Sequence, residues 1–311
     1  MFILLRFTLE QKIFEICNIK IGGQLGQLPT VLIGNLFYKG MPEVKNHKTG
    51  EFDHKSVSKW IEVAETFSNK TGVPHFLDIM AMYPKAMEKY VEFVSEKSRT
   101  PFLIDGANAE TRIAGLKIVD EKGLQERTIF NAISPITSES ESEAIKKTHV
   151  KAAIILAHNE MDFSPNGRIT ILKGFENEVG LLETAKKAGI EKTLIDTIVF
   201  DVPSIAYAAE AVTLVKEELG LPAGCSPANA TYDWRLAKKG KLTREGFIAA
   251  NASVHSLAQF CGANFLIYGP IKQAENLILA TAVNDAIIAY HSMRRFNLKP
   301  LTQTHPIYKI F

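Results

Sequence analysis

The sequence predicts a closed (β/α)8 barrel, the TIM-barrel fold, with a β-hairpin in front of it. Short apolar segments alternate with amphipathic helical segments along the chain, and this alternation is typical of a parallel sheet. Eight such units in 311 residues match the usual size of one barrel, so we expect a single domain over residues 1–311. An open doubly wound sheet is the alternative, but its glycine-rich first turn is missing.

Residues 1–23 are expected to form the hairpin. Apolar and polar residues alternate between Phe7 and Ile21, with a turn near Asn18, and a pair of glycines from Gly22 ends the pattern. A hairpin in this position is expected to close the bottom of the barrel.

The barrel itself follows as eight strands and eight helices in strict alternation. The expected strands are Thr30–Leu36, His75–Ala81, Pro101–Asp105, Thr128–Ile133, Ala152–Ala157, Thr193–Phe200, Pro222–Cys225 and Asn264–Tyr268. The expected helices span residues 55–70, 84–97, 109–122, 139–148, 176–188, 204–219, 244–261 and 271–291. Two long connections, 159–175 and 228–243, follow strand ends and are predicted to be lids or docking surfaces. The tail, 298–311, is expected to pack on the surface.

Composition and charge exclude several classes of protein. Hydrophobic residues make up 46% of the chain and charged residues 23%, as in ordinary globular proteins. The net charge of +2 gives no reason to expect nucleic acid or an acidic membrane surface as a partner. No apolar run of about 18 residues predicts a membrane span, and the N-terminus lacks the features of a signal peptide. Three widely spaced cysteines, without a CxxC pair, favour a reducing cytoplasm.

The candidate site is a set of polar residues where the apolar strands end. In a barrel, side chains at the C-terminal ends of the strands project into the mouth. This pattern selects Asp78, Asp105, Asn108, Asn131, Ser134, His158, Asn159, Glu160, Asp201, Ser204, Ser226 and Asn229. The set contains no lysine for a Schiff base and too few histidines for a metal centre, so no protein-bound metal is expected.

A ring of carboxylates and amides suits a flat, neutral heterocycle. An ionised carboxylate accepts two parallel hydrogen bonds, and an asparagine amide offers both donors and an acceptor. The edge of a pterin ring presents these partners. Each residue also has a structural alternative: Asp105 can cap the next helix, Asn131 can be a buried structural amide, and Asp201 can belong to a turn.

Longer motifs make the sequence recognisable as a family member. The stretch from Leu77 to Lys117, LDIMAMYPKAMEKYVEFVSEKSRTPFLIDGANAETRIAGLK, and the later FNAIS resemble corrinoid-dependent pterin methyltransferases. Within that group, GGQLGQLPTVLIGNLFYKG and IKQAENLILA resemble the H-type subunit of tetrahydromethanopterin S-methyltransferase. They also resemble its bacterial relatives, the methylcobalamin:tetrahydrofolate methyltransferases. The resemblance implies a TIM barrel of the pterin-binding type and covers nearly the whole chain.

The resemblance also implies roles for individual residues. By the resemblance, Asp78, Asn108 and Asn159 are expected to hold the pterin ring, and Asn131 and Asp201 to line the same pocket. The strand-end pattern adds Asp105 and Asn229 to the expected pterin-binding residues. The better-known folate enzymes carry an asparagine just beyond the sixth strand, which bonds the reacting nitrogen. Here that stretch reads DVPSIAYAA and has none, so Asp201 or Ser204, together with Asn131, is expected to act on that nitrogen, directly or through water.

The expected activity is transfer of a methyl group from methylcobalamin, carried by a corrinoid protein, to N5 of tetrahydrofolate. The alternatives are the H-type subunit of the tetrahydromethanopterin enzyme and a barrel that binds a pterin without catalysis. The basic segment 228–243, which includes Arg235 and Lys238, is either a docking surface or an ordinary solvated loop. Relatives imply a homodimer.

Overall fold

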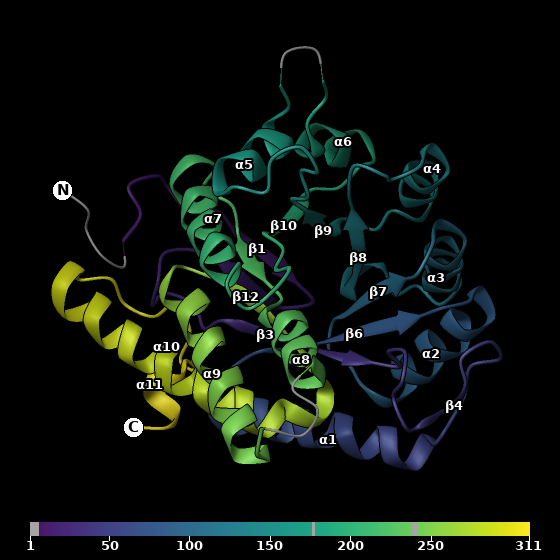
Figure 1. Ribbon diagram of the computed structural model, residues 1–311, viewed down its shortest axis with the longest axis horizontal. Coiled ribbons are helices and arrows are strands. Elements are labelled where there is room, and N and C mark those ends of the chain that lie inside the picture. The colour runs from purple at the N-terminus through teal and green to yellow at the C-terminus, as the bar shows by residue number, and fades with distance from the viewer. Residues whose placement is uncertain (1–5, 176–177, 238–241) are drawn as a thin grey trace.

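The computed structural model describes residues 6–175, 178–237 and 242–311 and confirms the closed barrel. Eight parallel strands close in the order β3, β6, β7, β8, β9, β10, β11, β12, so neighbours in sequence are neighbours in the barrel. Helices surround the strands on the outside (Figure 1). The strands are β3 (Val31–Leu36), β6 (His75–Ala81), β7 (Phe102–Gly106), β8 (Thr128–Ile133), β9 (Ala152–Leu156), β10 (Lys192–Asp196), β11 (Ala223–Cys225) and β12 (Phe265–Pro270).

The helices follow the strands as expected for βα units. They are α1 (His54–Thr71), α2 (Pro84–Lys97), α3 (Ala109–Glu121), α4 (Glu139–Thr148), α5 (Pro165–Lys173), α6 (Leu181–Lys187), α7 (Ile205–Glu218), α8 (Pro227–Ala237), α9 (Arg244–Phe260), α10 (Ala274–Phe296) and α11 (Pro306–Lys309). Short 3-10 turns span Gln125–Arg127 and Ile271–Gln273. None of the helices within the described ranges is both long and apolar enough to cross a membrane.

The N-terminal hairpin closes one end of the barrel. Strands β1 (Ile13–Ile16) and β2 (Ile19–Gly22) pair antiparallel, as the sequence predicts. Ile16 and Ile21 are fully buried and belong to the same apolar cluster as Phe76 and other side chains inside the barrel. A second small ribbon, β4 (Val44–Asn46) with β5 (Glu51–Phe52), lies in the connection from β3 to α1. Because apolar side chains fill the lower barrel, space for a ligand remains at the opposite end.

The sixth barrel strand is shorter than predicted. Strand β10 ends at Asp196, four residues before the expected end. The carboxylate Oδ1 of Asp196 accepts the backbone N–H of Ile198 at 2.8 Å, and Ile198 has a positive φ of 56°. Because the N–H of Ile198 bonds the Asp196 side chain and not a neighbouring strand, the backbone turns here and the strand ends. The apolar run of residues 197–200 is therefore a connection and not strand.

Both long connections contain a helix that the sequence prediction missed. Helix α5 lies within 159–175, and α8 fills most of 228–243. Each begins at a Ser-Pro pair, Ser164-Pro165 and Ser226-Pro227, and proline is favoured at the first helical position. Residues 238–241, part of the predicted basic loop, lie outside the described residues. The same holds for 176–177 at the start of the predicted helix 176–188, whose described part is helical from Leu181. The tail packs through α11 against α10, with His305 fully buried.

Candidate active site

A cavity of about 300 Å³ lies where the barrel strands end. Side chains from β3, β6, β7, β8, β9, β10 and β12 and from the segments that follow β7, β8 and β11 surround it. Its lining residues are Asn35, Asp78, Met80, Asp105, Arg112, Asn131, Ala132, Ser134, Ile136, Leu156, Asp196, Ser226, Asn229 and Ile267. The cavity thus combines carboxylates and amides with an apolar wall, as sites for flat heterocycles do.

Three carboxyl groups share the cavity, and burial perturbs all of them. Burial raises the pKa of Asp78 well above its usual value, and the neighbouring Asp105 raises it further. Burial also raises the pKa of Asp105 to about 6, against the opposing effect of Arg112. Burial raises the pKa of Asp196 to about 6, opposed by the N–H of Ile198 and by Arg168. Burial therefore favours the protonated form of each group, and near neutral pH Asp105 and Asp196, with pKa values of about 6, are mostly ionised.

Two buried oxygens at the cavity lack hydrogen-bond partners. Oδ1 of Asp78 and Oδ1 of Asn35 are both shielded from solvent, and nothing in the described part of the chain donates to either. These residues lie opposite each other in the register of β3 and β6. Buried polar atoms without partners are rare in folded proteins, so a ligand or ordered water with N–H or O–H donors is expected there.

The amides lie nearer the opening. Asn131 is half-buried and pairs in register with Asp105 across β7 and β8. Asn229 is exposed, and its Oδ1 accepts the hydroxyl of Ser226 at 3.1 Å. No residue that the structure describes takes up the Nδ2 hydrogens of Asn229. This amide is therefore held in place at the mouth with its donors free.

The structure brings six of the predicted strand-end residues to the cavity: Asp78, Asp105, Asn131, Ser134, Ser226 and Asn229. The structural alternative for Asp105 is wrong, since the cap of the following helix is Asn108. Two carboxyl groups and two amides from the predicted set therefore surround one opening.

Four other predicted site residues are not among the residues that line this cavity, and their roles in binding or catalysis stay predictions. Asn108 is the N-cap of α3, and its side chain accepts the N–H of Thr111 at 2.9 Å. Asn159 organises its own loop, accepting from Met161 and donating to Gly167. Asp201 and Ser204 bond each other in an exposed turn. Short polar side chains of this kind bond neighbouring backbone readily, and here that local role prevails.

Three polar or charged lining residues are missing from the sequence prediction. Asn35 lies next to the last residue of β3, and the strand-end pattern did not include it. Asp196 was placed inside a longer strand. A signal was available, because Leu-Ile-Asp occurs both at residues 103–105 and at 194–196, and each triplet ends at the cavity. Arg112 reaches the cavity from α3, and no strand pattern points to it.

The chemistry of the cavity favours a neutral ring with N–H donors. Carboxylates that accept two hydrogen bonds each match an amino group beside a ring N–H. No cluster of three or more His, Cys, Asp or Glu side chains suited to a metal ion occurs within residues 6–175, 178–237 and 242–311. Among the described residues that line the cavity, the cation is Arg112, which is already bonded to Glu141 at 2.6 Å and is therefore poorly placed to hold a phosphate.

Comparisons with known proteins agree with this chemistry. Residues 9–297 match the family described as tetrahydromethanopterin S-methyltransferase MtrH subunit. The chain is 34% identical to the tetrahydromethanopterin S-methyltransferase H subunit of Methanothermobacter thermautotrophicus, over 98% of this chain and 99% of that one. It is 35% identical to the protein of the same name from Methanopyrus kandleri, over 96% of each chain. The H subunit of a putative methyltransferase, mtx, from Methanosarcina barkeri is 33% identical, over 97% of this chain and 98% of that one.

Solved structures support the fold. Dihydropteroate synthase of Xanthomonas albilineans superposes with a TM-score of 0.60 at 14% identity, covering 89% of this chain and 98% of that one. The enzyme of the same name from Thermus thermophilus gives 0.59 at 13% identity, covering 89% and 100%. At these identities the likeness shows a shared TIM-barrel architecture.

Proposed function

Because the chain belongs to the MtrH family of tetrahydromethanopterin S-methyltransferase subunits, we propose that it moves a methyl group between N5 of a reduced pterin and a corrinoid carrier. The observation that carries the proposal is the ring of carboxyl and amide groups at the barrel mouth, with two buried oxygens still lacking donors. A pterin edge has an amino group and ring N–H groups that fit these acceptors.

The pterin is proposed to be tetrahydromethanopterin. Two relatives named as subunits of a tetrahydromethanopterin enzyme are 34% and 35% identical to this chain, and the similarity covers nearly their whole length. Tetrahydrofolate, the pterin expected from the sequence, stays a prediction. The two cofactors share the ring edge that faces the carboxyl groups, so the choice between them depends on the rest of the molecule.

The homodimer and the cytoplasmic location also stay predictions. Sedimentation equilibrium tests the homodimer.

In this proposal the protein positions the reactants and supplies no nucleophile. Asp105 and Asp196 accept hydrogen bonds from the ring, while Asn131 offers a donor and an acceptor. The carrier provides or receives the methyl group at its cobalt. Transfer requires N5, the methyl carbon and the carrier to meet in line at near-attack distance, which a rigid ring of hydrogen bonds achieves. Asn229, at the open side, is placed to hydrogen-bond N5 as its charge changes.

The rim of the mouth supports docking of a large partner. Ile136 and Met161 are 81% and 94% exposed. Phe163 and Phe200, about half exposed, pack edge to face with ring centroids 5.1 Å apart. These four residues follow β8, β9 and β10 at the mouth end. Exposed apolar side chains on the segments that follow barrel strands are typical of a binding surface, and the carrier is the proposed partner.

A methyl-transfer assay tests the proposed function. The protein is mixed with a methylated corrinoid and with tetrahydromethanopterin or tetrahydrofolate in parallel, and loss of the methyl–cobalt absorption is followed. We expect transfer with tetrahydromethanopterin to be the faster by at least about tenfold, since each lost contact to a matched group lowers the rate by such factors. Faster transfer to tetrahydrofolate would reverse the choice of pterin. Tight pterin binding without transfer to either would support the non-catalytic alternative.

Affinity for the reduced pterin is expected to rise with pH through about 6. The pKa values of Asp105 and Asp196 are both raised to about 6, and a ring with N–H donors binds their ionised forms. Below that pH each group must lose a proton on binding, so affinity falls by about tenfold to a hundredfold between about pH 7 and pH 5. Calorimetric titration in two buffers of different ionisation enthalpy measures this proton release. Equal affinity at both pH values would contradict it.

A further inference from the structure

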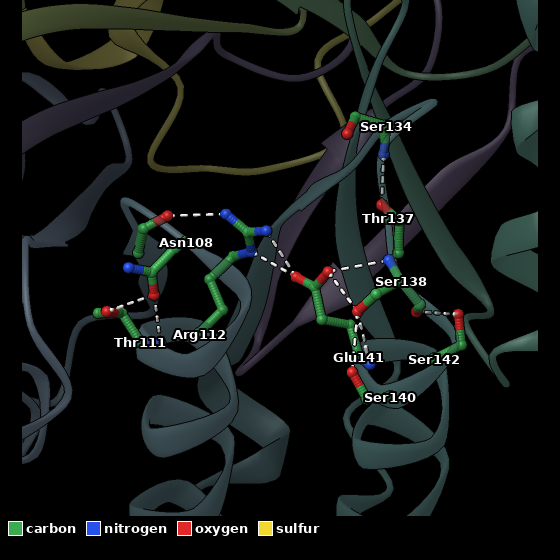
Figure 2. A network of polar contacts seen from close by, with 10 residues as sticks. Asn108, Thr111, Arg112, Ser134, Thr137, Ser138, Ser140, Glu141 and Ser142 are labelled. Atoms are coloured by element: carbon green, nitrogen blue, oxygen red, sulfur yellow. Dashed lines mark hydrogen bonds and ion pairs between the residues drawn. The ribbon is translucent and has the colours of Figure 1, made fainter.

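Arg112 is held at the edge of the cavity by contacts on two sides. Its Nη1 donates to the carbonyl of Gly106 at 2.7 Å, and Gly106 directly follows Asp105. Its Nε and Nη2 both reach Oε1 of Glu141 at 2.6 Å. Figure 2 shows the guanidinium between the start of α3 and the start of α4, with Glu141 facing it. These contacts hold the side chain in one orientation, and Arg112 is one of the residues that line the cavity.

Glu141 is itself fixed, so the arrangement does not depend on Arg112 alone. The side chain of Glu141 is 1% exposed. Its Oε2 accepts the backbone N–H of Ser138 at 3.0 Å and the Ser138 hydroxyl at 2.9 Å. These contacts form the capping box at the start of α4. Since Ser134 and Ile136 of the preceding loop line the cavity, the same ion pair ties the cavity wall to two helices.

Arg112 is the cation among the described residues that line the cavity. Asp105 shares this lining with the buried carboxyl groups Asp78 of β6 and Asp196 of β10 and with Arg112 of α3. Glu141 of α4 lies behind Arg112 and bonds it directly. Nearby negative charges and burial both raise the pKa of a carboxyl group, and a guanidinium held close to it lowers that pKa. Among the titratable residues described at the cavity, Arg112 is the one that can keep Asp105 ionised.

We propose that Arg112 is a positioning residue for the pterin-binding carboxylate: held by Gly106 and Glu141, it keeps Asp105 ionised and therefore able to accept hydrogen bonds from the ring. The identity of the ligand in this inference rests on the proposed function. The effect of Arg112 on the ionisation of Asp105 does not. Arg112 acts on Asp105 through the electric field and the Gly106 carbonyl, and its contribution is to the state of that carboxylate before the ligand arrives.

The variant Arg112→Gln tests the inference, because glutamine keeps hydrogen-bonding groups and removes the charge. Carbon-13 spectra of labelled aspartate, assigned with Asp105→Asn, follow the ionisation of Asp105 without any ligand. We expect its midpoint to move up by at least about one pH unit. Because the ionised fraction of Asp105 at pH 6 then falls from about one half to about one tenth, pterin affinity at pH 6 should fall by about fivefold. Affinity at about pH 9 should return to within about threefold of the unmodified protein, because Asp105 is ionised there in both.

Two further variants complete the design. Arg112→Lys keeps the charge and should recover at least about half of the shift, since a lysine is a point charge that cannot bond Gly106 and Glu141 together. Lys117→Gln removes an exposed cation from the same helix and should change neither measurement. An unchanged Asp105 midpoint in Arg112→Gln would overturn the inference, and so would an affinity loss of equal size at both pH values. If the unmodified protein binds neither pterin, the proposed function fails, while the ligand-free spectra still decide the role of Arg112.

Discussion

Asp105→Asn is expected to weaken reduced-pterin binding by at least about a hundredfold, because it replaces one of the two ionised acceptors in the cavity. Hydrogen bonds to a charged group contribute about 1.5–3 kcal/mol each, and a carboxylate can accept two side by side. The asparagine amide keeps one acceptor and points an N–H group at a ring donor. Calorimetric titration above pH 7, where Asp105 is ionised, measures the loss.

The same substitution is expected to leave the fold intact or to stabilise it. The pKa of Asp105 in the folded protein is raised to about 6, so the folded state binds this proton more tightly than the unfolded state. Its contribution to stability is therefore present in acid and is lost as pH rises from about 4 through about 6. Removing the charge should raise the free energy of unfolding above pH 6 by about 1–3 kcal/mol. Denaturant unfolding at pH 5 and pH 8 measures this difference.

Asp201→Asn is the matched control. Asp201 lies in an exposed turn outside the cavity, where Oδ1 accepts the N–H of Ser204, and an asparagine can accept the same bond. Pterin affinity should therefore stay within about twofold, as for ordinary surface substitutions. The reverse result, a large loss for Asp201 and none for Asp105, would refute the assignment of the pocket.

Asn229→Ala is expected to slow methyl transfer by about a hundredfold while changing pterin affinity by no more than about threefold. Asn229 lies at the open side of the cavity with free amide donors, where the methyl group would pass. A donor that acts mainly on the charge changing at N5 affects the rate more than the binding, and removing such a group typically lowers the rate by about 10²–10³. Single-turnover transfer kinetics and equilibrium titration of the same variant separate the two effects.

Asn166→Ala provides the comparison for that variant. Asn166 is an exposed amide on α5 that does not line the cavity. Neither its transfer rate nor its affinity should change by more than about twofold. A loss of affinity in Asn229→Ala as large as the loss of rate would show that the amide holds the ring in the ground state, and would remove it from the transfer step.

Much of the cavity could be predicted from the sequence because barrel strands have a strict period. Asp78, Asp105 and Asn131 interrupt apolar runs near the strand ends, and alternation along each strand decides which side chains face inward. Other predicted residues, such as Asn108 and Asp201, follow strand ends just as closely but are not among the lining residues. Their side chains bond the local backbone, and the sequence pattern does not separate a cap or turn residue from a ligand-binding one.

The barrel, its hairpin plug and the polar character of the mouth could all be predicted from the chain, since they follow from short-range periodicity and from which strands are apolar. Contacts in three dimensions were needed to learn that β10 stops at Asp196, and that Arg112 reaches the cavity from α3 and is fixed by Glu141 of α4. The first depends on a side-chain hydrogen bond that ends the strand. The second depends on two helices whose contacting residues are 29 positions apart in the chain, and a contact of that kind produces no sequence period.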